Sequence, residues 1–474
     1  MFVGRKYYLD DLASLWRKAT SSLVACRGRR RVGKSRLFRE FAMRTADQYV
    51  ELAGLPPRKG MTNQKQLDAF ATGLARATNG GKQHFGDWSE AFAALDKAID
   101  DSGRTVVMLD EISWMGGWDA DFPGYLKTAW DTMLHLHDRL IVVVCGSVNA
   151  WIKENILDNT GFVGRFSRDY VLPELDLGEC LPFWRKAADR VDTRTVFDIL
   201  SITGGIPRYL EELDPGLSAE ENIRRMCFVS SGTLFKDFNE IFAQVFGAEA
   251  VLKRAVLSTL AAGPMTGAEI AAALGRENNG HFSEQMRELE LAGFVTADRG
   301  MSPVTGRRTR VAKYRIRDNY TRFYLRYIEP HREEIANGSY RLSGLGSLPG
   351  WDSVMGLQFE NLIVNHAMEL VPALHLGGAI VQSAAPYRHE RNSRGGGCQV
   401  DLLMQTSRTA YLIEIKRQNR IGVEVEEQVE AKMRRLHARK GLSVRPVLVY
   451  LGELDGVIEG DGFFDALISA ESLL

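Results

Sequence analysis

Apolar runs alternate with amphipathic helical patterns along the first third of the chain. The runs cover residues 23–26, 49–52, 105–109, 140–145 and 170–172, and helical patterns lie at 89–99 and 125–136. This order predicts strands and helices arranged around a parallel sheet. The run at 105–109 has no polar alternation, which is typical of a strand that is covered on both faces.

Helical spacing dominates the middle of the chain. Residues 177–245 have apolar positions at helical intervals and predict a helical lid, and three short helices are expected at 251–260, 266–274 and 283–292. A basic hairpin follows the third of these helices. Its cationic residues are Arg299, Arg307, Arg308, Arg310, Lys313, Arg315 and Arg317. Three helices and a hairpin predict a winged helix-turn-helix.

The third of these helices is poorly suited to reading bases. It carries Glu284, Glu288 and Glu290 against Arg287. The hairpin arginines can still bind phosphates without reading sequence. A winged helix that binds protein or acts as a spacer is the alternative interpretation.

The last part of the chain begins after a segment rich in Gly, Ser and Pro at 331–350, which reads as a linker. Beyond it the pattern predicts a helix at 354–370, strands at 374–381, 399–404 and 410–415, a helix at 423–436 and a strand at 446–450. The predicted domains are a nucleotide-binding core (1–175), a helical lid (176–248), a winged helix (249–330), the linker (331–350) and a C-terminal α/β domain (351–474).

Composition limits the environment and the partners. The chain has 474 residues, too many for one core, and its 60 basic residues balance its 60 acidic ones. Any contact with nucleic acid must therefore come from local patches. The five cysteines are scattered without metal-binding spacing, and no apolar run is long enough to span a bilayer. We expect a cytoplasmic protein that makes no membrane contact.

A phosphate-binding loop is predicted between the first strand and the helix that follows it. The sequence reads Gly28-Arg29-Arg30-Arg31-Val32-Gly33-Lys34-Ser35, which has the Walker A spacing. In such a loop the backbone N–H groups and the helix N-terminus bind phosphate, Lys34 reaches the β- and γ-phosphates, and Ser35 binds Mg²⁺. The alternative is a chance glycine-rich turn. Phe2–Arg5 either borders an adenine pocket or is a plain packing segment.

Polar residues end two later strands. Asp110 and Glu111 follow the buried run at 105–109; Asp110 would hold Mg²⁺ and Glu111 would orient or deprotonate the attacking water. Acidic residues also stand at strand ends merely because they face solvent. Ser147 follows the next buried strand and is favoured over Asn149 as a γ-phosphate contact, with a plain polar turn as the alternative.

The C-terminal domain contains a second candidate site. Asp401, Glu414 and Lys416 lie within apolar strands, and residues two apart in a strand share a face. Two carboxylates and a lysine are suited to holding Mg²⁺ and activating water against a phosphodiester. The alternative is a Glu414–Lys416 salt bridge on an exposed edge strand. Gln428 and Lys432, one helical turn apart, either extend this site or form a solvated face.

The first half of the chain resembles the archaeal-type ATPases of the STAND branch of P-loop NTPases. The resemblance is carried by the glycine-rich loop with its three arginines and by Phe2-Val3-Gly4-Arg5, Leu109-Asp110-Glu111, Cys145-Gly146-Ser147, Val163-Gly164-Arg165 and Gly204-Gly205-Ile206-Pro207-Arg208-Tyr209. It implies that Arg165 is an arginine finger and that Pro207 lies in a lid near the base. A surface arginine in a turn is the alternative for Arg165.

The C-terminal domain resembles the PD-(D/E)xK nuclease fold, which often follows the winged helix in those ATPases. This resemblance implies that Asp401, Glu414 and Lys416 are the motif residues and that Glu360 is the acid on the first helix. Val400 stands where a proline is usual. The expected fold is therefore α/β: a P-loop NTPase sheet with a helical lid, a winged helix-turn-helix and a PD-(D/E)xK-like domain.

Together these features predict an ATP- and Mg²⁺-dependent ATPase that gates a DNA nuclease. The alternative is a nucleotide-dependent switch that binds DNA or protein partners, including a second copy of itself, without cleavage.

Overall fold

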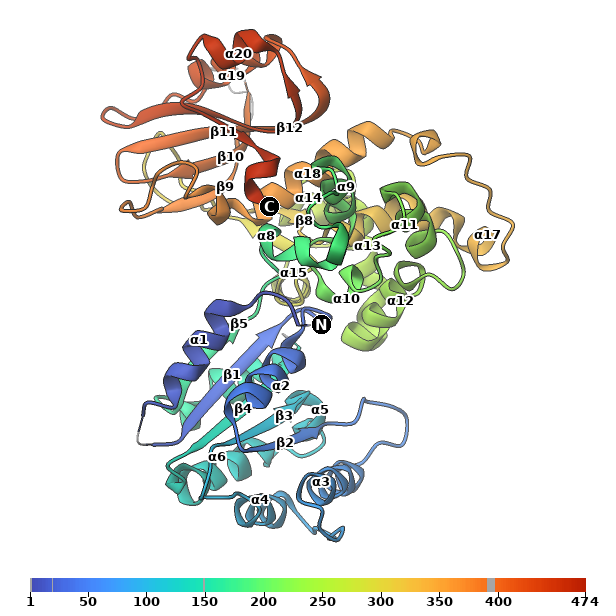
Figure 1. Cartoon of the computed structure of the whole chain (residues 1–474), viewed down its shortest axis with the longest axis vertical. Helices are drawn as coiled ribbons and strands as arrows, with labels where there is room; N and C mark the ends of the chain where they lie inside the picture. The colour runs from blue at the N-terminus through green and yellow to red at the C-terminus, as the bar shows by residue number, and fades with distance from the viewer. Residues whose placement is uncertain (1, 19, 148–149, 390–396) are drawn as a thin grey trace. The chain divides into compact units, whose positions relative to one another are not determined.

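The computed structural model describes residues 2–18, 20–147, 150–389 and 397–474. The chain forms two compact units (Figure 1). The first comprises residues 1–175 with 291–293, and the second comprises 176–290 with 294–474.

A five-stranded parallel sheet, in the order β2-β3-β4-β1-β5, forms the centre of the first unit. Its strands are β1 (Ser22–Gly28), β2 (Gln48–Ala53), β3 (Thr105–Asp110), β4 (Leu140–Ser147) and β5 (Phe166–Val171). Its helices are α1 (Lys6–Leu15), α2 (Lys34–Thr45), α3 (Asn63–Thr78), α4 (Trp88–Lys97), α5 (Ile112–Gly116), α6 (Phe122–Thr132) and α7 (Ala150–Ile152). The predicted parallel sheet is confirmed.

Burial on both faces explains the continuous apolar runs. Every residue from Val106 to Leu109 is fully buried, as parallel strands covered by helices require. An aromatic cluster joins the helices on one side, where Phe70 contacts Trp88 and Phe92 edge to face.

Helices fill the first part of the second unit. They are α8 (Leu177–Cys180), α9 (Thr193–Thr203), α10 (Pro207–Leu210), α11 (Ala219–Cys227) and α12 (Thr233–Phe246). Three further helices and a small sheet of order β6-β8-β7 follow. These are α13 (Ala250–Leu260), β6 (Met265–Thr266), α14 (Gly267–Ala273), α15 (Gly280–Leu291), β7 (Val295–Asp298) and β8 (Lys313–Ile316). Thr266 caps α14, in a capping box with Glu269.

A mixed five-stranded sheet of order β13-β12-β11-β10-β9 ends the chain. Its elements are α18 (Trp351–Asn365), β9 (Ser383–His389), β10 (Cys398–Gln405), β11 (Thr409–Ile421), α19 (Glu424–Arg435), β12 (Ser443–Leu454), α20 (Gly456–Gly460) and β13 (Ala466–Ser469). The strands β9, β10 and β11 are antiparallel, and β11, β12 and β13 are parallel.

One predicted strand of this domain is wrong. Residues 374–381 form turns, and the first strand begins at Ser383. Two glycines interrupt the apolar run, and Ile380 is 83% exposed, so the run does not supply a buried face. The short strand β13 was not predicted.

The expected linker is packed against its neighbours. Residues 332–336 form helix α17 (Arg332–Ala336), which follows α16 (Asn319–Phe323), and Ile335 and Leu345 are buried. Tyr340 stacks on Phe228 with ring centroids 5.7 Å apart. Apolar anchors therefore fix a segment whose Gly and Ser content suggested a flexible connection.

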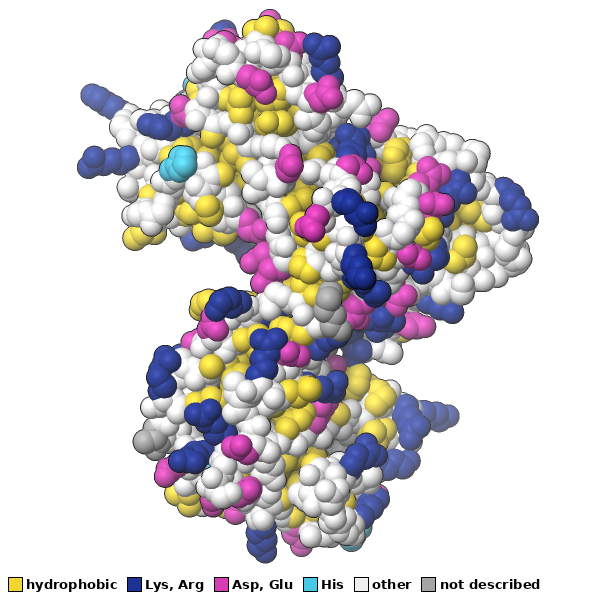
Figure 2. All heavy atoms as spheres, in the orientation of Figure 1, with side chains coloured by type: hydrophobic (Ala, Val, Ile, Leu, Met, Phe, Trp, Pro, Cys, Tyr) yellow, Lys and Arg dark blue, Asp and Glu magenta, His cyan; other side chains and the backbone are white. Residues whose placement is uncertain are grey.

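Charge is dispersed, in agreement with the balanced composition. On the face drawn in Figure 2, basic and acidic side chains are interspersed. Among the described residues, no helix combines the length and the apolar character needed to cross a membrane.

Candidate functional site

The loop between β1 and α2 has the backbone of a phosphate-binding loop. Gly33 has φ 90° and Arg31 has φ 73°, so the chain turns sharply before α2 begins at Lys34. A Cβ atom on Gly28 would lie 2.6 Å from the Leu172 carbonyl oxygen. The first glycine is therefore required by the close approach of a neighbouring segment.

The lysine and serine of the loop are positioned by local contacts. Lys34 is buried, and its Nζ donates to the carbonyl oxygens of Gly28 (2.9 Å) and Arg29 (3.1 Å). Ser35 Oγ donates to Asp110 Oδ2 at 2.6 Å. The hydroxyl and the carboxylate predicted to bind Mg²⁺ are thus adjacent, which is the arrangement that a shared cation needs.

Arg5 fastens the loop to the segment after β5. Its guanidinium is buried and donates to the carbonyl oxygens of Val32 (3.2 Å) and Pro173 (2.6 Å). The sequence left this segment as either the border of an adenine pocket or a packing segment, and it did not predict that Arg5 supports the loop. No local pattern reports a contact with Pro173, 168 residues away.

Glu111 follows Asp110 at the carboxyl edge of the sheet in a left-handed conformation, with φ 47°. Its Oε1 lies 3.8 Å from Arg30 Nη2, and its Oε2 is buried without a hydrogen-bond partner among the described residues. Burial raises the pKa of this carboxyl, and the charges of Arg30 and Lys34 oppose that shift. Such a carboxylate can accept a proton from water.

Ser147 lies between the two halves of the site. Strand β4 is inserted between β1 and β3, and Ser147 pairs with Gly28 in the ladder. In the part of the chain that the structure describes, the buried Oγ of Ser147 has no hydrogen-bond partner. Its predicted contact with the γ-phosphate stays a prediction. Asn149 lies outside the described residues.

Arg165 is remote from this edge. It directly precedes β5, whose Phe166 pairs with Leu23, five residues before Gly28; at about 3.3 Å per residue this is roughly 17 Å from the loop. Two bonds of 2.7 Å hold its guanidinium on Asp131 and lower the pKa of that carboxyl to about 2. The structure therefore does not bring Arg165 to the nucleotide site of its own chain.

Two other loop arginines and Pro207 complete the predicted set. Arg30 lies over the Trp114 ring at 4.7 Å, and Arg31 is exposed. Pro207 is the first residue of α10 in the second unit. Its predicted role in a lid stays a prediction.

The C-terminal acidic residues meet within the mixed sheet. Asp401 on β10 and Glu414 on β11 are buried, with 8% and 1% of their surfaces exposed. Asp401 Oδ2 accepts the Ile415 N–H at 3.1 Å. The alternative was a Glu414–Lys416 salt bridge on an exposed edge strand: the salt bridge is present, but β11 lies in the middle of the five-stranded sheet and is not an edge strand.

Lysines surround Glu414. Lys416 Nζ lies 2.8 Å from Oε1, as expected for residues two apart in a strand, and Lys432 of α19 lies 2.5 Å from Oε2. Gln428 Oε1 accepts from Lys416 at 3.5 Å. The structure therefore brings Lys432 to this site, whereas Gln428 is exposed and reaches it only through the contact with Lys416.

Glu360 on α18 adds a third carboxyl. Burial, followed by the nearby charge of Asp401, raises the pKa of Glu360 to about 7. Burial and the charge of Glu414 raise the pKa of Asp401 to about 6. A bound cation stabilises buried carboxyls that raise one another's pKa values, but among the described residues the ligand atoms of Glu360, Asp401 and Glu414 are not grouped within 4.8 Å of one another, so a divalent metal here stays a prediction.

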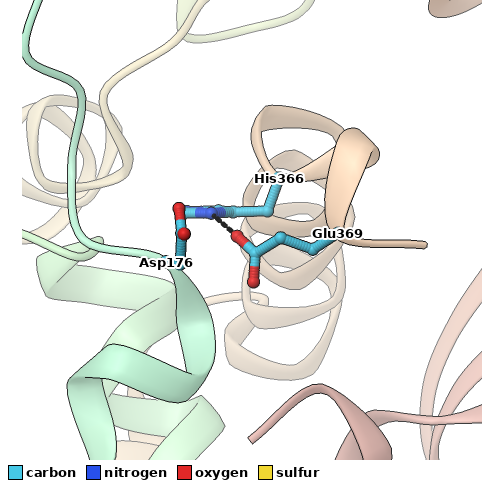
Figure 3. Close-up of side chains that lie close together, drawn as sticks. All are labelled: Asp176, His366 and Glu369. Carbon is cyan, nitrogen blue, oxygen red and sulfur yellow. Dashed lines mark hydrogen bonds and ion pairs between the residues drawn. The ribbon is translucent and has the colours of Figure 1, made fainter. Parts of the chain in front are cut away.

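Another cluster was missed in the sequence. Asp176, His366 and Glu369 have potential ligand atoms within 4.8 Å of one another (Figure 3). His366 Nδ1 is 2.5 Å from Glu369 Oε1, and Glu369 Oε2 accepts the Leu177 N–H at 2.9 Å. The carboxylate of Glu369 thus ties the start of α8 to the end of α18. Leu177 and Glu369 are 192 residues apart, so no sequence pattern links them.

Comparisons with known proteins agree with the first unit. Residues 2–213 match the model of a family described as an ATPase domain predominantly from Archaea. The uncharacterized protein MJECL04 of Methanocaldococcus jannaschii is 22% identical over 385 residues, which cover 78% of each chain.

Solved structures are also similar. The Walker-type ATPase PABY2304 of Pyrococcus abyssi has a TM-score of 0.51 at 14% identity, covering 69% of this chain and 96% of that one. The ORC2 protein of Aeropyrum pernix, solved as ADPNP-ADP complexes, has a TM-score of 0.47 at 14% identity, covering 70% and 94%. The family match supports an archaeal-type ATPase domain, and the first of these structures supports its P-loop ATPase fold.

Proposed function

We propose that this protein is an ATPase of the STAND type whose nucleotide state gates a metal-dependent DNA nuclease. The observation that carries the second half of the proposal is the burial of Asp401 and Glu414 on adjacent central strands, with Lys416 and Glu360 beside them. Buried carboxylates are costly unless they pair or bind a metal.

In the ATPase unit, the loop from Gly28 to Ser35 binds the phosphates of ATP. Lys34, now bonded to loop carbonyls, exchanges them for the β- and γ-phosphate oxygens, and Ser35 and Asp110 hold Mg²⁺. Bound Mg²⁺ neutralises charge on the phosphates. Glu111 accepts the proton of the attacking water, and Ser147 contacts the γ-phosphate.

The intervening segments transmit the nucleotide state. The helices from α8 to α12 act as the lid, with Pro207 near the base, and α13 to β8 form a winged helix. Arg165 serves in trans, at the nucleotide of a second copy, because roughly 17 Å separates it from its own loop. This role requires that the Asp131 bond opens on assembly.

In the C-terminal PD-(D/E)xK-like domain, Asp401, Glu414 and Glu360 hold the divalent metal. A divalent metal held there would supply Lewis-acid activation of water, and Lys416 would orient the attacking water and stabilise charge on the scissile phosphate. Glu414 would then have to exchange its contact with Lys432 or Lys416, since both lysines pair with it in the structure.

A nuclease assay tests this function. The protein is incubated with single- and double-stranded DNA and Mg²⁺ or Mn²⁺, with and without ATP. We expect cleavage that depends on the metal and changes with ATP, and that Asp401→Ala abolishes while ATP hydrolysis continues. A wild-type protein inert on every substrate would overturn the nuclease proposal.

A switch that binds without cutting is the second candidate. The two lysines on Glu414 favour it, because they already neutralise the carboxylate without a metal. In that case ATP would change DNA or partner binding, and Asp401→Ala would leave this change intact.

A further inference from the structure

A basic cavity adjoins the C-terminal acidic site. Its volume is about 510 Å³, and β7, the start of β9 and the end of α18 contribute to its walls. Four arginines and one aspartate line it: Arg299, Arg308, Arg315, Arg317 and Asp298. Four positive charges less one negative charge leave an excess of three, in a chain whose net charge is zero.

The arginines of the cavity differ in whether their charge is already paired, and Arg299 lies 3.6 Å from Glu290. Arg315 is buried and structural: its Nε lies 3.0 Å from Asp298, and its Nη1 donates to Asn365 at 2.9 Å. In contrast, Arg308 and Arg317 have no side-chain ion pair among the described residues, so their charge is available to an anion. Arg315 therefore does not bind phosphate, which corrects one of the predicted hairpin contacts.

The hairpin loop is fixed beside this cavity. The Met301 N–H donates to Ser383 Oγ at 3.1 Å, and Gln405 Nε2 donates to the Met301 carbonyl at 2.5 Å. The Arg439 N–H donates to the Pro303 carbonyl at 3.0 Å. These bonds hold the loop that carries Arg308 against β9 and β10.

Two elements, α18 and β9, connect the cavity to the acidic site. On α18, Val364 lines the cavity, and Glu360 stands four residues earlier on the same face, about 6 Å along the axis. On β9, Pro386 lines the cavity and lies opposite the bulge that contains Asp401. Arg388, two residues further along β9, is close enough to Glu360 to lower the pKa of its carboxyl.

We infer that this cavity holds the sugar–phosphate backbone of the nucleic-acid strand that is presented to the acidic site, through Arg308 and Arg317. The inference rests on the proposed function and names the part of the chain that receives its substrate. Each strand of B-DNA carries one charge per about 3.4 Å of helix axis, and neighbouring phosphates lie further apart than this along the strand itself, so one phosphate in the cavity leaves a neighbour near Glu360 and Asp401. Contacts to phosphate alone carry no base preference.

The test measures binding without cleavage. The whole chain is titrated, in EDTA, into a short fluorescein-labelled DNA strand of mixed sequence at several salt concentrations. We expect the double variant R308Q/R317Q to bind about tenfold more weakly, with a salt slope lower by about 1.4, or about 0.7 for each lost contact. The matched control is R307Q/R310Q, which removes two exposed arginines of the same loop that do not line the cavity.

Five outcomes are distinguishable. Equal losses in the two double variants, or no loss in R308Q/R317Q, would overturn the inference. Displacement of the strand by inorganic phosphate, beyond the effect of chloride at matched ionic strength, would show a site for a free anion and would also overturn it. If the protein binds DNA through these arginines but does not cut it, the proposal for the cavity stands and the nuclease proposal is refuted. If R308Q/R317Q cleaves DNA with an unchanged KM, the nuclease proposal stands and the proposal for the cavity is refuted.

Discussion

Arg417 on β11 forms an ion pair with Asp198 on α9. Its Nη2 and Nε lie 2.7 Å and 3.1 Å from Asp198 Oδ1, and only 3% of the arginine side chain is exposed. Arg417 directly follows Lys416, so this pair connects a helix of the proposed lid to the strand that carries Glu414. A movement of α9 would therefore act on the acidic site.

Asp198→Asn should weaken this connection. We expect ATP to change the rate of DNA cleavage less in this variant than in the wild type, while ATP hydrolysis is unaffected. The second unit should lose up to about 3 kcal/mol of stability, because the buried guanidinium loses its nearer counter-charge and keeps the Asp352 carboxylate, 4.0 Å away. Denaturant unfolding and cleavage rates with and without ATP measure both effects. Glu220→Gln removes an exposed partner of Arg224 and is the control; a full ATP response in Asp198→Asn would argue against the coupling.

Lys34→Ala should reduce ATP hydrolysis by about 100-fold or more, since it removes a charge directed at the transferred phosphate. Phosphate release measures the rate, and an equilibrium titration with labelled ATP measures binding. Lys59→Ala, at an exposed lysine of the same unit, should behave as the wild type. ATP binding at full strength in Lys34→Ala would count against the assignment of the loop.

Arg5→Ala should raise the KM for ATP more than it lowers kcat. The substitution leaves the Val32 and Pro173 carbonyls without their donor, so the loop becomes less ordered but keeps its phosphate-binding groups. The expected loss of stability is about 1–3 kcal/mol. Steady-state kinetics and thermal unfolding test this, and an unchanged KM would show that the loop does not need this support.

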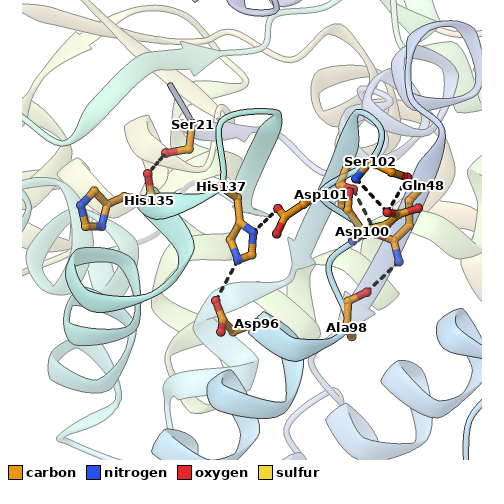
Figure 4. Close-up of polar contacts among 10 residues, drawn as sticks. Ser21, Gln48, Asp96, Ala98, Asp100, Asp101, Ser102, His135 and His137 are labelled. Carbon is orange, nitrogen blue, oxygen red and sulfur yellow. Dashed lines mark hydrogen bonds and ion pairs between the residues drawn. The ribbon is translucent and has the colours of Figure 1, made fainter. Parts of the chain in front are cut away.

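The stabilising contribution of His137 to the first unit should decrease as the pH rises. Its ring lies between Asp101 and Asp96, at 2.5 Å and 2.9 Å (Figure 4). Burial disfavours the charged ring, but the bonds to Asp101 and Asp96 outweigh it and raise the pKa. The stabilisation is therefore complete below the unfolded pKa of about 6.5 and is lost as the pH rises through the higher folded value. Unfolding midpoints of the wild type and His137→Gln should converge toward high pH; a constant difference would contradict this.

Sequence patterns predicted the sites better where the signal is local. The loop from Gly28 to Ser35 is contiguous, and Glu414 and Lys416 share a strand face, so motif and periodicity place them. The distance of Arg165 from the loop depends on the end of β5 at which it lies and on the place of β5 in the strand order. The motif around Arg165 contains neither piece of information. Asp198 and Arg417 are 219 residues apart and show no shared periodicity.

Amino-acid composition also gave two wrong predictions of local structure. The run that ends near Ile380 looks like a strand, yet its glycines and its exposure leave it as turns. Conversely, a segment rich in glycine and serine is held in place by Leu345 and Tyr340. Both errors arise because tertiary packing, and not local composition, determines whether an apolar side chain is buried.

The left-handed backbone of Glu111 lowers the stability of the fold, while its carboxylate is the proposed base of ATP hydrolysis. A glycine would adopt φ 47° without the steric cost that a side chain incurs there, of order 1–3 kcal/mol. Selection of this chain for heat resistance alone should therefore enrich Glu111→Gly, and the surviving variants would bind ATP but turn it over slowly. Under the proposed function, selection for turnover would retain the glutamate at this position.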